Sequence, residues 1–173
     1  MIFNTFFNFN PNSNSKLENK NFEELIKKFF TEKDFQKIFS EIQKKIPDDR
    51  KNFLDKKKFF WFENKEINLF FVDDEEIKKL NLEFRNKNSA TDCLSFEKTD
   101  EDKKDPFDNV FWECFIAMPY IKNQAEEYWV SLKYEITKMI IHSVLHLYWY
   151  DHIEDEDFLE MSKVEKEIII ELK

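Results

Sequence analysis

Apolar residues recur with helical spacing in the N-terminal third of the chain. Behind a capping-box pattern, Asn21 followed by Glu24, apolar side chains keep the i, i+3, i+4, i+7 spacing of one buried helical face. A second apolar phase continues this predicted helix until Pro47 stops it. The apolar positions of the two phases are Phe22, Leu25, Ile26, Phe29, Phe30, Phe35, Ile38, Phe39, Ile42 and Ile46.

Short runs rich in Phe, Ile and Val predict a small β-sheet. Polar segments separate these runs, and the segment 98–108 is strongly acidic. The predicted strands are residues 2–9, 66–72, 93–96 and 111–118, and we expect 2–9 to lie at an edge of the sheet.

Further helical patterns follow the predicted strands. Asp73 and Asp74 open a short helix, Pro119 suits the first turn of another, and Ser131 starts a strongly apolar one. These helices are predicted to end near Leu82, Trp129 and Tyr148, and a last helix is expected over about 155–172. About four strands mixed with five to six helices predict one α+β domain over residues 1–173, with the histidine-bearing helix central against a small mixed sheet.

The charge balance limits the partners that the protein can have. The 173 residues include 36 acidic and 27 basic side chains, a formal net charge of −9. This excludes a general nucleic-acid coat, which relies on Lys and Arg, and no DNA partner is expected. The segment Arg50–Lys58 holds five basic residues. It is either a solvated connector or, together with Arg85 and Lys87, a local basic groove for RNA.

Cysteine usage and hydropathy indicate the compartment. Cys93 and Cys114 are the only cysteines and no CxxC occurs, so reduced, buried thiols are expected rather than a disulfide. No run approaches the roughly 18 apolar residues of a membrane span. The first ten residues lack the basic start and small-residue cleavage site of a signal peptide. We therefore expect a soluble, cytoplasmic protein without membrane contact.

The three histidines of the chain are His142, His146 and His152, which fall within eleven residues. His142 and His146 are four residues apart, so they project from one face of a helix. His152 can return as a third ligand if the helix ends between them. Three neutral imidazoles with an open fourth position describe a catalytic zinc site, so one Zn²⁺ per chain is expected. The alternative is a set of partly buried histidines satisfied by hydrogen bonds.

A zinc peptidase is the obvious alternative function for these histidines, because metzincin peptidases share the spacing H-x3-H-x5-H. Those enzymes need a glutamate directly after the first histidine as general base. Here that position is Ser143. Without the carboxylate, the peptidase mechanism has no proton acceptor.

The string HSVLHLYWYDH (142–152) resembles the HGxLHLxGYDH signature of the YbeY family, bacterial endoribonucleases of ribosomal RNA maturation. Upstream, FRNKNSATDCLSF (84–96) is similar to the last part of the family's LNxxYRGKDxPTDVLSF. WECFIAM (112–118) resembles its GDIxIS strand, and QAEEY (124–128) resembles its QAxxY helix. The resemblance runs in order from about Glu66 to Glu167.

This resemblance implies a role for individual residues. His142, His146 and His152 match the family's zinc ligands, and Arg85 matches an arginine that would hold a phosphate or its transition-state charge. The implied function is a single-strand-specific, zinc-dependent endoribonuclease. It would act in maturation of the small-subunit rRNA 3′ end and in ribosome quality control, with ribosomal RNA, ribosomal subunits or assembly factors as partners.

The alternative function is a ribosome-assembly factor with a mainly structural zinc site and negligible nuclease activity. Such a site usually has four protein ligands. We expect no cysteine near the histidines, which argues against a closed site.

Several polar residues near these motifs have two interpretations. Glu135 lies seven residues before His142, so it either orients a ligand or forms a salt bridge on its helix. Asp151 either caps a turn or orients His152. In the TDCLSF motif Thr91, Asp92 and Ser95 are expected to hold the turn into a strand rather than to act in chemistry.

The chain contains no glycine, although the resemblance predicts several. Trp112, Trp129 and Trp149 stand at three of these positions, and Ser143 and Asn86 fill two others. At position 149 a positive φ would let the chain turn back. A non-Gly residue there costs roughly 1–2 kcal/mol. We hypothesise that these tryptophans are glycines in the native protein, translated as Trp from a codon that the source organism reads as Gly.

Overall fold

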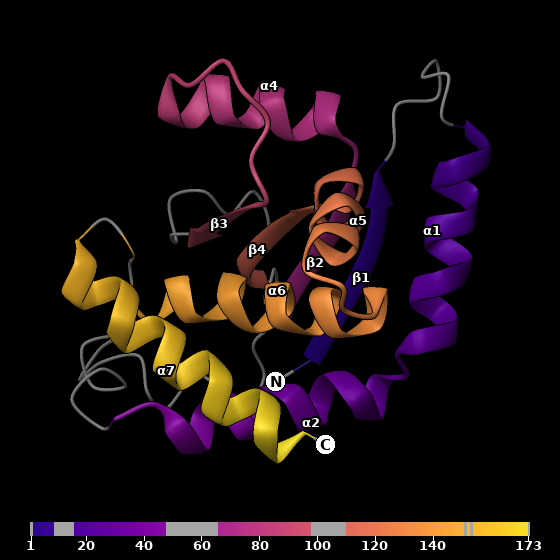
Figure 1. Cartoon of the computed structure of the whole chain (residues 1–173). Coiled ribbons are helices and arrows are strands. Elements are labelled where there is room, and N and C mark those ends of the chain that lie inside the picture. Colours follow the sequence, from indigo (N-terminus) through magenta and orange to yellow (C-terminus); the bar gives the residue numbers. More distant parts are fainter. Residues whose placement is uncertain are drawn as a thin grey trace.

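A mixed β-sheet lies between the helices in the computed structural model of the chain (Figure 1), which describes residues 2–8, 16–47, 66–97, 110–150, 152 and 154–172. The sheet has four strands in the described residues, in the order β1-β2-β4-β3. The pairs β1–β2 and β2–β4 are parallel, and β3 runs antiparallel to β4. The predicted edge position of the first strand is therefore confirmed. The strand bounds are β1 Ile2–Asn8, β2 Glu66–Val72, β3 Cys93–Glu97 and β4 Val110–Ala117.

The histidine-bearing helix α6 is central, as the sequence predicts. It contacts β3 and β4 of the sheet and also packs against three other helices, α2, α5 and α7. Helix α4 lies on the opposite side of the sheet from α6 (Figure 1). The helix bounds are α1 Lys16–Phe29, α2 Glu32–Lys45, α4 Asp74–Arg85, α5 Met118–Glu127, α6 Leu132–Leu147 and α7 Asp155–Glu171. Helices packed on a mixed sheet make this an α+β domain.

Helix α6 owes its central place to its composition. Ser131 begins the helix as its N-cap, and the Ser131 hydroxyl accepts a hydrogen bond from the backbone N–H of Tyr134. A helix that is apolar nearly all round must be buried. Each large aliphatic side chain of this kind contributes about 1.5–3 kcal/mol when fully buried. The buried apolar residues of α6 are Ile136, Met139, Ile140, Ile141, Val144, Leu145 and Leu147.

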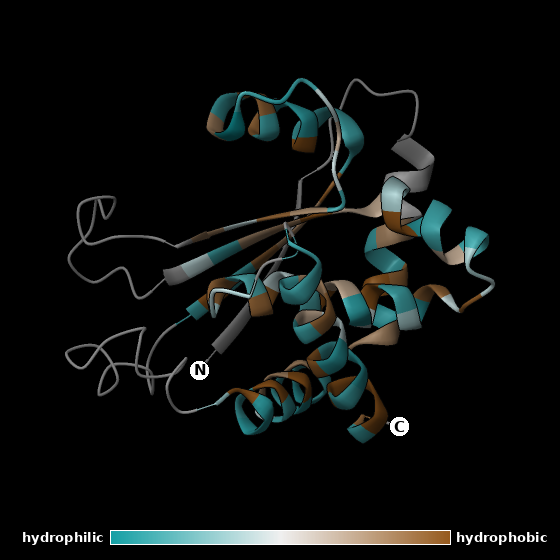
Figure 2. Ribbon diagram, turned by 60° about the vertical axis from the view of Figure 1, so that its left-hand side comes forward, coloured by the Kyte–Doolittle hydropathy of each residue, from teal (hydrophilic) through white to brown (hydrophobic). Residues whose placement is uncertain are grey.

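The two faces of the sheet belong to two separate apolar clusters. Along β3, Cys93 belongs to the large core that includes α6, whereas Leu94 belongs to a small cluster with Ile77 of α4. This alternation follows from the period of two in a strand. Figure 2 shows hydrophobic residues concentrated along the strands and interspersed with hydrophilic ones around the helices. The alternation therefore turns Cys93 toward the histidine-bearing helix.

The N-terminal helical pattern differs from the prediction of one continuous helix. The chain forms α1 and α2 with a break after Phe29, and Thr31 is the N-cap of α2. Thr31 and Asp34 form a full capping box, whereas Asn21 lies inside α1, which begins at Lys16. The predicted capping box at Asn21 is therefore wrong, because the helix already begins five residues earlier. The break between the two helices was not predicted because the apolar spacing continues across it.

The other predicted boundaries lie close to those observed. The short helix after β2 continues past Leu82 to Arg85, which places Arg85 in its last turn. Pro119 lies in the first turn of α5, as predicted. The acidic segment 98–108 and the basic segment 50–58 lie outside the described residues. None of the helices in the described part of the chain combines the length and apolarity needed to cross a membrane.

Candidate functional site

His142 and His146 face each other from consecutive turns of α6. Their Nε2 atoms are 3.0 Å apart, and the ring planes are nearly perpendicular at 88°. Both side chains are half-buried at the C-terminal end of the helix. The helical spacing that the sequence shows therefore brings two imidazole nitrogens to a single point.

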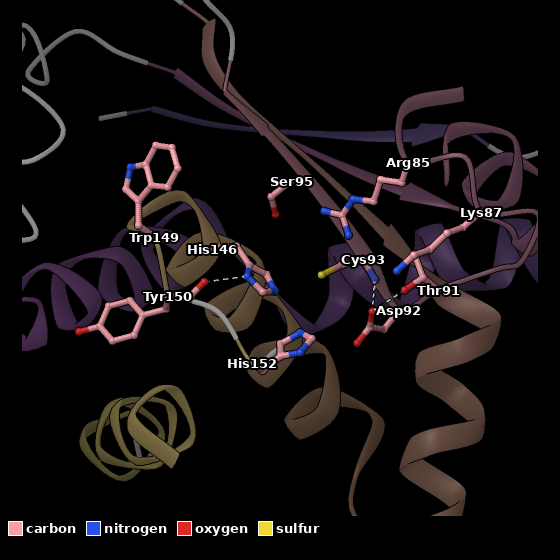
Figure 3. A pocket seen from close by; sticks show the side chains of 10 residues that line it. All are labelled: Arg85, Lys87, Thr91, Asp92, Cys93, Ser95, His146, Trp149, Tyr150 and His152. Carbon is pink, nitrogen blue, oxygen red and sulfur yellow. Dashed lines mark hydrogen bonds between the residues drawn. The ribbon is translucent and has the colours of Figure 1, made fainter. Parts of the chain in front are cut away.

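The second ring nitrogen of each histidine has a fixed partner. Nδ1 of His142 lies 2.6 Å from Oε1 of Glu165, which comes from α7. Nδ1 of His146 lies 3.0 Å from the backbone oxygen of Tyr150 (Figure 3). A carbonyl or an ionised carboxylate only accepts, so each Nδ1 carries the proton. With both Nδ1 atoms engaged in this way, the two Nε2 atoms face one another, an arrangement that suits a cation bound between them.

His152 joins the pair from beyond the end of the helix. Its ring centroid lies 5.3 Å from that of His142 and 5.2 Å from that of His146. Imidazole nitrogens about 2.0–2.1 Å from a tetrahedral zinc ion place ring centroids about 5 Å apart. The ring centroids therefore have the separations expected around such an ion. Within the described residues, however, the donors that lie within 4.8 Å of one another are those of Cys93, His142 and His146, and His152 is the exposed histidine of the three.

Cys93 is also close to the histidines, so the expectation that no cysteine lies near them is wrong. Its Sγ and one ring nitrogen each of His142 and His146 all lie within 4.8 Å of one another. Burial chiefly, with the negative charge of Asp92, raises the pKa of the Cys93 thiol well above its ordinary value, while Arg85 acts in the opposite sense. The sequence distance between Cys93 and the histidines concealed this contact.

The turn after α6 explains how His152 returns. Trp149 has φ 63°, in the left-handed region, and its N–H donates to the carbonyl of His146. The N–H of Tyr150 donates to the carbonyl of Leu145, as in a Schellman ending. The sequence-predicted need for positive φ at position 149 is therefore confirmed.

Two further expected glycine positions have the same backbone conformation. Asn86 has φ 56° and caps α4, and Trp129 has φ 54° after α5. Asn adopts this region more readily than most residues, whereas a bulky residue such as Trp is an outlier there. Trp112 differs, because it is fully buried in β4 with its ring 5.5 Å from that of Tyr148. Positive φ thus supports the glycine hypothesis at 129 and 149 and gives no backbone reason for it at 112.

Arg85 ends α4 at the rim of a pocket that is also lined by two of the histidines, His146 and His152. The pocket has a volume of about 570 Å³, and Figure 3 shows the Arg85 guanidinium directed into it. Asn81 fixes the segment after α4 through a 2.8 Å bond from its Nδ2 to the backbone oxygen of Ser89. The lining residues are Arg85, Lys87, Thr91, Asp92, Cys93, Ser95, His146, Trp149, Tyr150 and His152.

The TDCLSF residues hold the backbone in place, in agreement with the sequence interpretation. Oδ1 of Asp92 accepts from the Thr91 hydroxyl at 3.0 Å and from the N–H of Cys93 at 2.8 Å. The Ser95 hydroxyl donates to the backbone oxygen of Ser143 at 2.8 Å. Ser143, at an expected glycine position, is fully buried. The Ser95 bond connects β3 to α6 next to His142, and the two Asp92 bonds hold the turn into β3.

The carboxylate that contacts a histidine is not the one that the spacing suggested. Glu135 is buried and forms a 2.9 Å ion pair with Lys138, so its salt-bridge interpretation holds. Glu165 contacts His142 instead, and the sequence analysis missed it because it lies on another helix. An acidic residue on the inner face of α7 was the available signal. Asp151 lies outside the described residues.

The comparisons with known proteins agree on one family. The family model described as endoribonuclease YbeY matches residues 10–173. A Clostridium botulinum protein (strain Eklund 17B, type B) named endoribonuclease YbeY is 38% identical over 124 residues, which is 62% of this chain and 75% of the relative. A Finegoldia magna protein of the same name is 39% identical over 110 residues, which is 64% of this chain and 71% of the relative.

A solved structure has the same fold. The solution structure of a Thermotoga maritima protein is similar with a TM-score of 0.50 and 22% identity, over 98% of this chain and 89% of that one. At that identity the likeness concerns the fold alone. The family match extends over nearly the whole sequence, including α6 and the turn that follows it. The chain therefore belongs to the YbeY family.

Proposed function

We propose that the chain is a zinc-dependent endoribonuclease that cleaves single-stranded ribosomal RNA, with one Zn²⁺ held by His142, His146 and His152. One observation carries the proposal: the Nε2 atoms of His142 and His146 meet 3.0 Å apart, beside a pocket that His146 and His152 line together with Arg85. The naming of the relatives as endoribonucleases supports the substrate class.

The histidines suit such an ion because their orientation is fixed before it binds. Glu165 and the Tyr150 carbonyl each hold one Nδ1, so the two Nε2 atoms need only a small movement to bind an ion. Neutral imidazole nitrogens are preferred zinc ligands. A zinc ion bound there would act as a Lewis acid toward a phosphate oxygen or a water molecule.

Arg85 would bind the RNA backbone. Its guanidinium is exposed at the pocket, so a phosphate reaches it without unfolding any element. A guanidinium offers paired N–H donors that match two phosphate oxygens and stabilise charge that develops during cleavage. Lys87 lines the same pocket and adds a second positive charge. Arg85 is therefore the proposed catalytic residue.

The proposed setting is ribosome biogenesis in the cytoplasm. The substrate would be the 3′ end of small-subunit rRNA, with a further role in ribosome quality control. The partners would be ribosomal subunits or their assembly factors rather than DNA or a membrane. An acidic chain with a formal charge of −9 needs a localised site for RNA, and the pocket with Arg85 and Lys87 meets that need.

A second function, an assembly factor with a mainly structural zinc, is favoured by one observation. Cys93 adds a fourth potential donor beside the histidines. Four protein ligands are typical of structural zinc sites, whereas a catalytic site keeps a position open. The two functions differ in whether the zinc-loaded chain cleaves RNA.

The test combines zinc analysis with an RNA cleavage assay. The purified chain, His146→Ala and Arg85→Ala are compared on an RNA that has a single-stranded 3′ extension beside a stem. We expect one zinc per chain in the wild type and in Arg85→Ala, and none in His146→Ala. Cleavage should occur only in the wild type. Equal cleavage by wild type and Arg85→Ala would contradict the proposal, and zinc binding without any cleavage would favour the assembly factor.

A further inference from the structure

Cys93 lies at the point where strand β3 passes beneath the histidine-bearing helix. As the first residue of β3 it faces the core on the α6 side, and it is 5% exposed. Figure 3 shows its sulfur directed toward His146, with the Arg85 guanidinium above the sulfur in this view. The N–H of Cys93 donates to Asp92 and the hydroxyl of Ser95 donates to α6, so the backbone on both sides of Cys93 is fixed.

The distances around Cys93 suit coordination by one ion. Its sulfur and one ring nitrogen each of His142 and His146 lie within 4.8 Å of one another, and the two Nε2 atoms are 3.0 Å apart. Around tetrahedral zinc, with Zn–S about 2.3 Å and Zn–N about 2.0–2.1 Å, sulfur and nitrogen lie about 3.6 Å apart and two nitrogens about 3.3 Å apart. A small movement of side chains brings the three donors to such distances.

The chemistry of the donor set points the same way. A thiolate and neutral imidazoles together suit zinc and cobalt better than the hard ions magnesium and calcium. A single cation would bind the buried thiol and the two facing imidazole nitrogens together. The motif that the chain resembles has Val at this position, so the donor is a feature of this sequence.

We infer that Cys93 is a further ligand of the metal held by the histidines. This inference rests on the proposed function only for the metal site itself. On binding, the Cys93 thiol gives its proton to solvent and the sulfur bonds to the ion as a thiolate; no oxidation or reduction is involved. With His142, His146 and His152, Cys93 makes four protein donors. A substrate phosphate would then reach the ion only by displacing the thiolate or by adding a fifth ligand.

The experiment uses the full chain with Co²⁺ as a spectroscopic probe. A thiolate bound to Co²⁺ gives a charge-transfer absorption in the near ultraviolet, which imidazole ligands do not give. The variants are Cys93→Val, the nearly isosteric Cys93→Ser, and Cys114→Val as a matched control. Cys114 is also a buried thiol of the sheet, on the neighbouring strand β4. Within the described residues it is not part of the ligand cluster.

We expect the band in the wild type and in Cys114→Val, and its loss in both Cys93 variants. The affinity of the Cys93 variants for Co²⁺ should fall at least about tenfold, since removal of even an outer partner has an effect of that size. Circular dichroism establishes that each variant is folded, and Cys93→Ser serves if the valine variant is not.

Two results would overturn the inference: a wild-type cobalt protein without the band, or a band that persists in folded Cys93→Ser. If cobalt binds without the band and His146→Ala abolishes binding, the histidine site stands and only the role of Cys93 falls. If no cobalt binds to the wild type at all, the proposed metal site falls with it.

Discussion

Replacing Trp129 by glycine is expected to stabilise the protein. Trp129 has φ 54°, and its side chain is 94% exposed. A non-Gly residue in this left-handed conformation costs roughly 1–2 kcal/mol, and Trp129→Gly removes that cost. The greater freedom of glycine in the unfolded chain offsets about 0.5–1 kcal/mol. Because almost none of the indole is buried, the free energy of unfolding should rise by about 0.5–1 kcal/mol.

Equilibrium unfolding in urea, with a thermal scan, measures this change. For a chain of this size the melting temperature should rise by about 1–4 °C. Trp129→Ala is the matched control, because it also removes the indole but keeps a β-carbon at positive φ. We expect Trp129→Gly to be more stable than Trp129→Ala by about 0.5–1 kcal/mol. If the two variants are equally stable, the backbone strain at this position does not exceed the entropic cost of glycine and the reasoning is wrong.

The same argument applies with less force to Trp149. Its φ is 63°, but the side chain is 60% exposed, so the substitution also removes some packing. The gain for Trp149→Gly should therefore be smaller than for Trp129→Gly. Peptide mass spectrometry of the protein from its native host tests the underlying hypothesis directly. Gly at 129 and 149 is expected, and Trp at either position would refute it.

Three further predictions concern the site and the fold. Glu165→Gln should weaken zinc binding about 10–100-fold in a chelator competition, because His142 loses its charged partner; an unchanged affinity would show that Glu165 does not orient the ring. Arg85→Lys should slow RNA cleavage about 100-fold at unchanged zinc content, and an unaltered rate would exclude paired phosphate contacts. Thr31→Ala should lower the free energy of unfolding by about 1 kcal/mol near neutral pH. Hydrogen bonds from Thr31 lower the pKa of Asp34 below 3.8, so this stabilisation is present above that pH and is lost as the pH falls through the folded-state pKa. Urea titrations near neutral pH and well below pH 3.8 should show that the stability difference between wild type and Thr31→Ala shrinks in acid. A constant difference would contradict the role of Asp34 in the capping box.

Local signals predicted most of the fold. The boundaries of β2 match the prediction, and Ser131 marks the start of α6 because capping is a property of a few neighbouring residues. The break between α1 and α2 was not predicted, because Phe29, Phe30 and Phe35 continue the apolar spacing across it. A capping pattern at Thr31, with Asp34 three residues later, is present in the sequence, but the apolar spacing runs across it.

The candidate site was predictable only where its residues are neighbours in sequence. His142 and His146 share a helix, and the turn at Trp149 returns His152 to them. Glu165 and Cys93 come from a separate helix and a strand, and no local pattern indicates which residues of packed elements touch. Strand alternation could have assigned Cys93 to a face of the sheet. It could not have said which turn of α6 that face meets.

The acceptor that fixes His146 is a main-chain oxygen, that of Tyr150. No side-chain substitution removes this backbone oxygen, and it neither titrates nor oxidises as a side chain can. Only the path of the chain through the turn can move it, and that path depends on the backbone angle of residue 149. Mutations in this turn should therefore appear as defects in metal affinity even though none of them alters a ligand. Natural sequences would then keep residues at this turn that adopt the required backbone angles, whatever the chemistry of their side chains.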